Sequence, residues 1–397
     1  MQTVVLAAGE GTRMRPLTAD RPKPMLPVAG KPLVAHTVET AIAAGASRIV
    51  LVVGYEADAV RTYFEEADAD LDVPVTFVTQ DRRRGTADAV ASAVPALDDG
   101  PFAVLNGDAL YEVADLRSLF ESGPAVGSYR VENPSAYGVL ERGERGYLEG
   151  VIEKPDDPPS NLINTGAYVF PAETRDRLDV AESDRGELEL TDALQRACES
   201  VDVDVVPVDR WLDVGRPWEL LEANEWKLAD LDTRVRGTVH PDATITGDVV
   251  IEDGARIKSG VVIDGPAYVS AGATVGPNAY VRGATYLGAD TKIGHAVEVK
   301  NSVVDDGSSL GHLSYLGDSV LGRNVNFGAG TNVANLRHDG NSVAFTVKGD
   351  RVSTGRRKFG VVCGDRVKTG IDTSINAGVR LDTETTTGPG ETITRDR

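Results

Sequence analysis

A chain of 397 residues is long enough for two or three domains that each bury a core, and its hydrophobic content of 41% is that of a globular protein. Its 61 acidic residues outnumber its 41 basic ones, and the resulting charge of −20 would repel a phosphate backbone, which argues against nucleic-acid binding. The sequence has no run of eighteen apolar residues, and neither Cys198 nor Cys363 has a second Cys or a His cluster near it. These features argue against a membrane span, a disulfide framework and a zinc site.

The N-terminal residues MQTVVLAAGE lack the cationic start and the cleavage site of a signal peptide, so we expect a soluble, cytoplasmic protein. The acidic excess, with very few Lys beside many Arg, is typical of chains adapted to high internal salt, where counter-ions screen self-repulsion. An ordinary acidic protein is the alternative.

Residues 1–228 alternate short aliphatic runs with helical patterns. Runs of mostly β-branched residues predict buried strands at TVVLAAG, SRIVLVVG, VPVTFVTQ, PFAVLNGD and VDVDVVPV. Between them, KPLVAHTVETAIAAG and TADAVASAVPAL carry apolar residues at helical spacing. This order predicts an α/β domain with a Rossmann-like, mainly parallel sheet, whose ligand site lies at the carboxyl ends of the strands.

The segment LAAGEGTRMRPLTADRPKPMLPVAGKPL, residues 6–33, is rich in Gly and interleaves five cations: Arg13, Arg15, Arg21, Lys23 and Lys31. Gly residues let backbone N–H groups close round phosphate oxygens, and fixed cations neutralise charge on a leaving pyrophosphate. The spacing matches neither a Walker loop nor the dinucleotide fingerprint. The alternative is a Gly-rich turn with a solvated basic face. Five cations in one loop of an acidic chain argue against it.

The pattern changes after residues 211–231, WLDVGRPWELLEANEWKLADL, which predict a strand end and a helix. We expect a linker at residues 229–238. From Val239 to Val299 an aliphatic residue recurs every six positions, with Gly, Asn or Asp in the turns between. This period is typical of a hexapeptide repeat, so residues 239–397 are expected to form an all-β, left-handed parallel β-helix.

The repeat is interrupted twice. After Val299 the phase slips to Val304, Leu310 and Leu316. Residues 336–359 leave the period, and the turn signals HDGN and KGD predict a hairpin insert there. The stretch SSLGHLSYLGDSVLGRNVNFGAG, residues 308–330, crosses the slip and adds polar residues that a repeat does not need. Such residues suit acetyl transfer, which requires a base, an oxyanion donor and a cation for a sugar phosphate.

The loop at residues 6–33 resembles the GxGTRM…PKP signature of sugar-1-phosphate nucleotidyltransferases. The motifs TQDRRRGTADAV, LNGDAL, AYGVL, IEKP, INTGAYVF and WLDVG follow in that family's order over residues 1–228. The resemblance implies attack of a sugar-1-phosphate on the α-phosphate of UTP or dTTP with Mg²⁺, and Arg13 and Lys23 as the cations that hold pyrophosphate. The implied nucleotide-binding residues are Leu6, Ala8, Gly9, Gly11, Thr12, Gln80, Gly85 and Thr86. The implied sugar-phosphate residues are Gly138, Glu153, Lys154 and Asn164, and the implied metal ligands are Asp108 and Asp213.

WLDVG is closer to the glucose-1-phosphate thymidylyl and uridylyl branch than to the branch that makes UDP-N-acetylglucosamine. This leaves the nucleotide and the sugar of this domain open.

The second half resembles the acetyltransferase domain of the bifunctional glucosamine-1-phosphate acetyltransferase / N-acetylglucosamine-1-phosphate uridylyltransferase family. VRGATYLG, VEVKNS, GHLSYLGDSVLGRNVNFGAGT and VAN fall in its order, and ANLRHDG with TGRRKFG is similar to its archaeal members. The resemblance implies acetyl-CoA as donor, glucosamine-1-phosphate or galactosamine-1-phosphate as acceptor, and a homotrimer or a multiple of it. It implies His312 as general base, Asn335 beside the acetyl group, and a sugar-phosphate site of Arg282, Lys300, Tyr315 and Asn326. No comparable set of polar and basic residues surrounds the other histidines in the sequence, which are His36, His240, His295 and His338.

Two alternatives remain open. A single-activity glucose-1-phosphate or mannose-1-phosphate nucleotidyltransferase would use the β-helix only for assembly, and would not require His312, Lys300 and Tyr315 together. Subunits of a translation-factor exchange complex share both domain types without catalysis, but they would be expected to lose the cationic loop and the metal acids.

Overall fold

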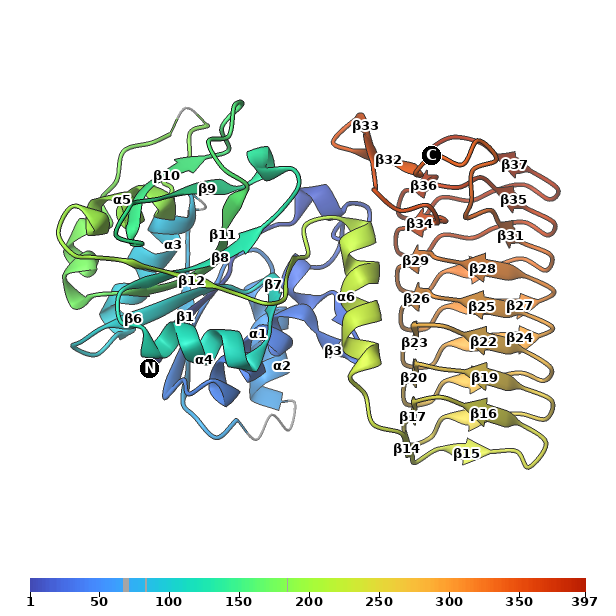
Figure 1. Ribbon diagram of the computed structural model, residues 1–397. Coiled ribbons are helices and arrows are strands. Elements are labelled where there is room, and N and C mark those ends of the chain that lie inside the picture. The colour runs from blue at the N-terminus through green and yellow to red at the C-terminus, as the bar shows by residue number, and fades with distance from the viewer. Residues whose placement is uncertain (67–70, 83, 184) are drawn as a thin grey trace. The chain divides into compact units, whose positions relative to one another are not determined.

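The computed structural model describes residues 1–66, 71–82, 84–183 and 185–397, and their contacts divide the chain into two compact units. The first unit consists of Met1–Glu10, Pro22–Met25 and Pro32–Asp213. The second consists of Gly11–Arg21, Leu26–Lys31 and Val214–Arg397 (Figure 1). The contact units therefore change at Val214, and the expected boundary after residue 228 stays a prediction.

Among the described residues of the first unit, nine strands form one mixed sheet in the order β10-β9-β11-β6-β1-β4-β5, with β8 paired to β11 and β12 (Figure 1). β6, β1, β4 and β5 are mutually parallel neighbours, whereas β11 runs antiparallel to β6. The strands are β1 (Gln2–Ala7), β4 (Arg48–Val53), β5 (Val75–Thr79), β6 (Phe102–Asn106), β8 (Ala125–Arg130), β9 (Gly138–Arg142), β10 (Leu148–Glu153), β11 (Leu162–Phe170) and β12 (Asp204–Pro207). All five strands predicted from the sequence are confirmed.

Helices cover both faces of this sheet, because its central strands are apolar on both sides. Val4 of β1 packs in one core with α3 (Thr86–Ala93) and α5 (Leu190–Cys198). Val5, the next residue, packs in a second core with α1 (Leu33–Ala43), α2 (Ala57–Glu66) and α4 (Val113–Glu121). The unit is therefore an α/β domain of the predicted class. None of the helices in the described ranges is long and apolar enough to cross a membrane.

Short elements complete the first unit and the segments next to it. Two small strands, β7 (Ala109–Tyr111) and β13 (Trp211–Asp213), pair antiparallel. The remaining short elements of this part of the chain are η1 (Thr12–Met14), η2 (Lys23–Met25), β2 (Pro27–Val28), β3 (Lys31–Pro32), η3 (Val94–Ala96), η4 (Pro134–Ala136) and η5 (Ala172–Arg177).

The second unit contains a left-handed parallel β-helix with three long faces (Figure 1). The first face holds β14 (Arg234–Val235), β17 (Val249–Ile251), β20 (Ala267–Val269), β23 (Thr285–Leu287), β26 (Val303–Val304), β29 (Val320–Leu321), β34 (Val362–Cys363) and β36 (Arg380–Leu381). The second holds β15 (Thr238–Val239), β18 (Arg256–Ile257), β21 (Thr274–Val275), β24 (Lys292–His295), β27 (Ser309–His312) and β30 (Asn326–Phe327). The third holds β16 (Thr244–Thr246), β19 (Val262–Asp264), β22 (Tyr280–Arg282), β25 (Glu298–Lys300), β28 (Tyr315–Gly317), β31 (Asn332–Val333), β35 (Ser374–Ile375) and β37 (Thr392–Ile393).

The repeated aliphatic residues fill the interior of the β-helix, as the period of six predicts. Ile251, Val269 and Leu287 stack in register on the first face and are buried. Val239 and Ile245, in the first turn, are only partly buried. The phase slip is a turn that is one residue shorter than the turn before it. Val269 pairs with Leu287, 18 positions later, whereas Leu287 pairs with Val304, 17 positions later.

Asn and Asp recur at the corners because these corners need a left-handed backbone. Asn301 and Asp318, on successive turns, have φ values of 46° and 50°. Asn, Asp and Gly adopt this conformation at the lowest cost, which explains the polar residues between the aliphatic ones.

An antiparallel hairpin lies within residues 336–359. Its strands are β32 (Ala344–Val347) and β33 (Asp350–Ser353). Phe345 of this hairpin, Phe359 and Trp218 of α6 (Pro217–Ala229) form an edge-to-face aromatic cluster. The helix after WLDVG therefore belongs to the second unit, and its Trp218 side chain packs against the insert.

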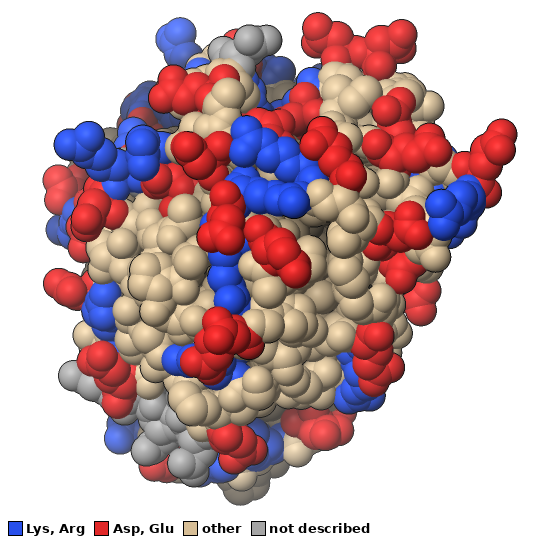
Figure 2. All heavy atoms as spheres, turned by 90° about the vertical axis from the view of Figure 1, so that its left-hand side faces the viewer, with Lys and Arg blue, Asp and Glu red and all other residues tan. Residues whose placement is uncertain are grey.

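Acidic side chains are spread over the face that Figure 2 shows, and a band of Lys and Arg lies between them. The acidic residues behind the net charge of −20 are therefore not gathered in one patch on this face. Surface ion pairs contribute little stability individually.

One ion pair of the second unit is different because it is buried. Arg21 pairs with Asp305, and their side chains are 11% and 3% exposed. Replacing Asp305 with Ala would leave the guanidinium buried without its carboxylate, so we expect the free energy of unfolding to fall by about 3–5 kcal/mol. The control is Asp202→Ala, which removes the exposed partner of Arg145 and should cost at most about 1 kcal/mol. Urea unfolding followed by circular dichroism measures both, and equal losses would contradict the prediction.

Candidate functional sites

Several expected nucleotide-binding residues lie at one edge of the first unit's sheet. Leu6 is near the carboxyl end of β1, and Ala8 and Gly9 follow that strand. Gln80 follows β5 and Asp108 follows β6. Because β6, β1, β4 and β5 are parallel neighbours, these strand ends share one edge, where ligands bind in open α/β sheets.

A cation and two carboxylates gather at this edge. The Lys23 ammonium, from η2, lies 2.5 Å from the Asp108 carboxylate, and Lys23 is only 5% exposed. Asp213 ends β13 and pairs with Ala109, the residue after Asp108. Burial first, and then the charge of Asp108, raise the pKa of the Tyr111 phenol well above its usual value, and Asp213 contributes in the same direction. The structure thus brings three expected residues together.

The donor set suits Mg²⁺, which usually takes one or two carboxylates and completes its shell with water and substrate phosphates. In the described part of the chain, no cluster of three or more His, Cys, Asp or Glu could hold a metal alone. A site of Asp108 and Asp213 would therefore need phosphate oxygens from a substrate. The Lys23 ammonium on Asp108 shows that this carboxylate attracts a cation.

The segment after β5 is held by its own hydrogen bonds. The Gln80 amide donates to the Gly85 carbonyl at 3.1 Å and to the Asp88 carboxylate at 2.8 Å. Gly85 has a φ of 126°, and a Cβ there would approach the Leu188 carbonyl oxygen to 2.3 Å. The Thr86 hydroxyl accepts the N–H of Leu190 at 2.9 Å. Gly85 and Thr86 therefore have roles in packing, and their expected binding of the nucleotide stays a prediction.

The expected sugar-phosphate residues lie on β9, β10 and β11. Gly138 pairs with Glu153 across β9 and β10, and the Lys154 ammonium is 3.1 Å from the Glu153 carboxylate. Arg185, which sequence reasoning did not single out, lies 3.3 Å from the same carboxylate. The Asn164 amide donates to the Tyr168 hydroxyl at 2.5 Å and accepts the N–H of Gly166 at 2.8 Å. Each of these side chains is thus oriented by a neighbour.

The cations of the Gly-rich loop have different roles. Gly11, Thr12 and Arg13 belong to the second contact unit, so their expected binding of phosphate stays a prediction. Arg21 is engaged by Asp305, which the interpretation of five interleaved phosphate cations did not foresee. A buried carboxylate on a distant segment neutralises its charge, so Arg21 is a structural residue.

In the β-helix, His312 is exposed at the end of β27, and it pairs in register with His295 of β24. The two side chains are neighbours on successive turns. Sequence reasoning did not predict that His295 lies beside His312. The shortened turn obscured this contact, because it changes the distance in sequence between stacked residues.

Arg282, Lys300 and Tyr315 lie on the third face, and each contacts an acidic or polar partner. Arg282 and Lys300 pair in register, and so do Glu298 and Tyr315. The Arg282 guanidinium lies 2.7 Å from Glu298. Burial, and then Asp318 and Glu298, raise the pKa of Tyr315 above its usual value, so its hydroxyl stays protonated.

Lys300 and Asn335 meet at Asp318, which sequence reasoning missed. The Lys300 ammonium donates to Asp318 at 2.7 Å, and the Asn335 amide donates to Asp318 at 2.5 Å and to the Tyr315 hydroxyl at 3.2 Å. An Asp in YLGD looks like an ordinary corner residue, so only its stacking above Lys300 marks it.

Asn326 lies on a different face of the β-helix from Arg282, Lys300 and Tyr315. It is on β30, in the second face, where it pairs with Ser309 of the strand that carries His312. The structure therefore places Asn326 on the same sheet as His312, and Arg282, Lys300 and Tyr315 on the adjacent sheet.

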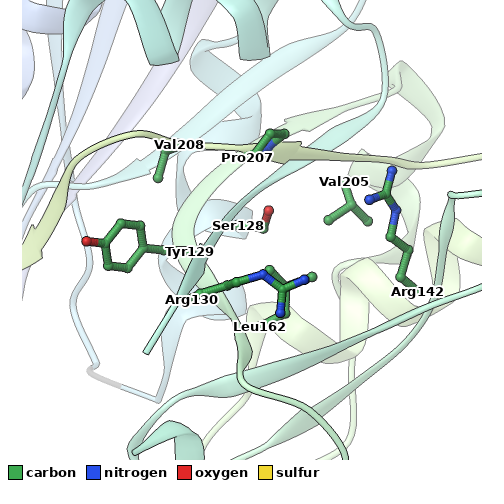
Figure 3. A pocket seen from close by; sticks show the side chains of 8 residues that line it. All are labelled: Ser128, Tyr129, Arg130, Arg142, Leu162, Val205, Pro207 and Val208. Atoms are coloured by element: carbon green, nitrogen blue, oxygen red, sulfur yellow. The ribbon is translucent and has the colours of Figure 1, made fainter. Parts of the chain in front are cut away.

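A hollow of about 380 Å³ lies on the first unit's sheet, and Figure 3 shows the side chains that line it. Val205 and Pro207 of β12 and Ser128 of β8 contribute to it, with Arg130 and Arg142 beside them. The Ser128 hydroxyl is used internally, because it donates to the Val206 carbonyl at 3.1 Å. None of the expected site residues lines this hollow.

Comparison with known families matches both halves of the chain. The nucleotidyl transferase family matches residues 2–229, and the pattern described as the GMPPB C-terminal domain matches residues 263–387. The first match covers more than half of the chain and includes all of the expected nucleotidyl-transfer residues.

Three relatives extend the comparison. "Bifunctional protein GlmU" of Methanococcus vannielii is 39% identical over 404 residues, which cover 100% of this chain and 95% of the relative. The "Bifunctional sugar-1-phosphate nucleotidylyltransferase/acetyltransferase" of Sulfurisphaera tokodaii is 40% identical over 404 residues, covering 100% and 98%. The "Low-salt glycan biosynthesis nucleotidyltransferase Agl11" of Haloferax volcanii is 38% identical over 343 residues, covering 83% and 94%.

Proposed function

The chain belongs to the family of bifunctional sugar-1-phosphate nucleotidylyltransferases and acetyltransferases, and on that premise we propose that it catalyses both reactions. It acetylates glucosamine-1-phosphate with acetyl-CoA and transfers UMP from UTP to the N-acetylated product, which gives UDP-N-acetylglucosamine and pyrophosphate. The observation that carries the proposal is that a relative named for both activities matches along 100% of the chain, which includes both candidate sites. A second relative that matches along 100% of the chain is named bifunctional.

For nucleotidyl transfer, the residues at the strand ends hold and orient phosphates. A sugar phosphate oxygen attacks the α-phosphate of the triphosphate and pyrophosphate leaves, so catalysis rests on positioning and charge. Arg13 and Lys23 neutralise the leaving pyrophosphate, and Lys154 holds the attacking sugar phosphate. Mg²⁺ on Asp108 and Asp213 supplies further positive charge at the phosphates when bound. Gln80, tied into its loop, presents a fixed polar group to the nucleotide.

For acetyl transfer, the residues near the shortened turn divide the work. The amine of the sugar attacks the thioester carbon, the C–S bond breaks, and the CoA thiolate leaves. The His312 imidazole takes the amine proton, which the departing sulfur ultimately receives. Arg282, Lys300, Tyr315 and Asn326 hold the sugar phosphate, and Asn335 lies by the acetyl group.

One substrate panel tests the proposal. The purified protein is given sugar-1-phosphates with UTP, dTTP or GTP, each with and without acetyl-CoA. We expect glucosamine-1-phosphate to be consumed only with acetyl-CoA, and pyrophosphate release to follow with UTP. Galactosamine-1-phosphate tests a wider amino-sugar range. The Haloferax relative, named for nucleotidyl transfer alone, supports the second candidate: a single-activity glucose-1-phosphate nucleotidyltransferase. Nucleotidyl transfer without any acetylation would favour that candidate.

We expect the protein to assemble as a trimer or a multiple of it through faces of its β-helix. Several large apolar residues of the β-helix are exposed, which favours a protein contact there; among them are Val262, Tyr280, Leu313 and Ile371. Val262 and Tyr280 are neighbours on the third face, and Leu313 is next to His312. Light scattering at assay concentration and salt should give a mass of three chains or a multiple, and a monomer would rule the assembly out.

We further propose that the protein works in a cytoplasm of high salt. Its charge of −20 must be screened, and the Debye length falls to about 3 Å at 1 M salt. We therefore expect activity and native circular dichroism to require molar KCl and to decline as salt is removed. Full activity with an unchanged spectrum in dilute buffer would contradict this expectation.

A further inference from the structure

Asp318 is a buried carboxylate at a corner of the β-helix. It follows β28, has a φ of 50°, and is 3% exposed. A buried carboxylate is costly unless hydrogen bonds and an opposite charge compensate it. The groups around Asp318 therefore show why the fold retains it.

Three side chains donate hydrogen bonds to this carboxylate. One oxygen accepts the Lys300 ammonium at 2.7 Å and the Asn335 amide at 2.5 Å. The other accepts the Asn301 amide at 3.0 Å. Two of the donors, Lys300 and Asn335, are expected in the acetyl-transfer site, and the Asn335 amide also reaches the Tyr315 hydroxyl. One carboxylate thus connects three expected site residues.

The second oxygen connects Asp318 to α6. The Asn301 amide also donates to Glu225 of α6 at 2.7 Å. Glu225 forms a two-pronged pair with Arg356, with one contact of 3.0 Å. Burial would lower the pKa of Arg356, but the hydrogen bonds that its guanidinium donates to Glu225 raise it above its usual value. Two cations and two carboxylates therefore balance one another in this cluster, and α6 holds Asn301 on Asp318.

This geometry fixes both the position and the presentation of the site residues. Lys300 is held with its ammonium directed at the corner, and its side chain is 16% exposed. The Asn335 amide nitrogen donates to both Asp318 and Tyr315, which fixes the orientation of the amide. Networks of this kind hold side chains in one arrangement before substrate binds.

We propose that Asp318 is a positioning residue of the acetyl-transfer site, which sets Lys300 and Asn335 in place and is itself held by Asn301 and Glu225. The inference rests on the proposed acetyltransferase function. Asp318 does not touch the reacting atoms, so its role is carried by the residues that it orients.

The test is Asp318→Asn, which retains the left-handed corner because Asn tolerates it. Small displacements of site residues can cost up to about 100-fold, so we expect kcat for acetylation of glucosamine-1-phosphate to fall by about 10-fold to 100-fold. The rate of pyrophosphate release should change less than about twofold, since it depends on neither Lys300 nor Asn335. The control is Asp365→Asn, which removes an equally buried carboxylate, the partner of Arg323, and should leave acetylation unchanged.

A double-mutant cycle with Lys300→Met shows whether Asp318 acts through Lys300. If it does, Asp318→Asn should have less effect in the Lys300→Met background. Additive losses would overturn the proposal, and so would an Asp318→Asn kcat within about twofold of the parent's.

Reductive methylation of Lys300, measured by mass spectrometry, does not depend on acetyl transfer. The ammonium should react several-fold faster in Asp318→Asn than in the parent, because its partner has lost its charge. An unchanged rate would overturn the positioning of Lys300. A parent that acetylates no amino-sugar phosphate, yet shows the change in methylation, would overturn the proposed function and leave the positioning intact.

Discussion

Replacing Asp108 with Ala should abolish pyrophosphate release while acetyl transfer from acetyl-CoA continues at nearly the parent rate. Asp108 follows β6, lies 2.5 Å from the Lys23 ammonium, and is next in sequence to the residue that pairs with Asp213. Its removal deletes one of two proposed metal carboxylates and frees the cation proposed to hold pyrophosphate. Electrostatic groups of this kind typically contribute about 10²–10³ each to the rate. Pyrophosphate release and thioester consumption, measured on the same preparation, report the two activities.

Two further variants separate chemistry from stability. Asp108→Asn retains a hydrogen-bond acceptor for the buried Lys23 but loses the charge, so it should fold normally and remain inactive in nucleotidyl transfer. Asp115→Asn is the matched control, because Asp115 is buried and accepts the backbone N–H of Asp209. It should keep nucleotidyl transfer. An active Asp108→Asn variant would exclude Asp108 as a metal ligand.

The fold was predictable because periodic patterns encode it. Runs such as those around Val50 and Val104 are buried on both faces, and continuous apolar runs of that kind are typical of parallel strands. In the β-helix, the aliphatic residues from Ile251 to Val299 occupy the interior at every sixth position. In both patterns the same requirement, burial of an apolar side chain, recurs along the chain. A single sequence is therefore enough to reveal it.

Parts of the candidate sites could not be predicted, because they depend on contacts between turns. His295 lies beside His312 only because the turn between them is one residue shorter than its predecessors. Asp318 reaches Lys300 through the same stacking. Arg21 pairs with Asp305, which is 284 positions away in sequence. Local composition carries no information about partners that are so far away in sequence. Because only its Gly-rich surroundings were visible, Arg21 resembled a phosphate ligand.

Replacing His312 with Ala should produce the opposite pattern to Asp108→Ala. Loss of a general base typically costs about 10²–10⁴ in rate, so acetylation of glucosamine-1-phosphate should fall by that factor. Nucleotidyl transfer to N-acetylglucosamine-1-phosphate should be unchanged, because His312 lies on β27 of the second unit, whereas Lys23 and Asp108 belong to the first unit. Exposure of the imidazole also makes a large loss of stability unexpected.

His240→Ala is the matched control, since His240 is an exposed histidine of the β-helix whose neighbour is Asp242. It should acetylate at the parent rate. Comparison of the two variants excludes a general effect of removing an imidazole from the β-helix. If His312→Ala acetylated as fast as the parent, the histidine would be a turn residue. The polar residues at the shortened turn would then need another explanation, and a β-helix used only for assembly would account better for the second half of the chain.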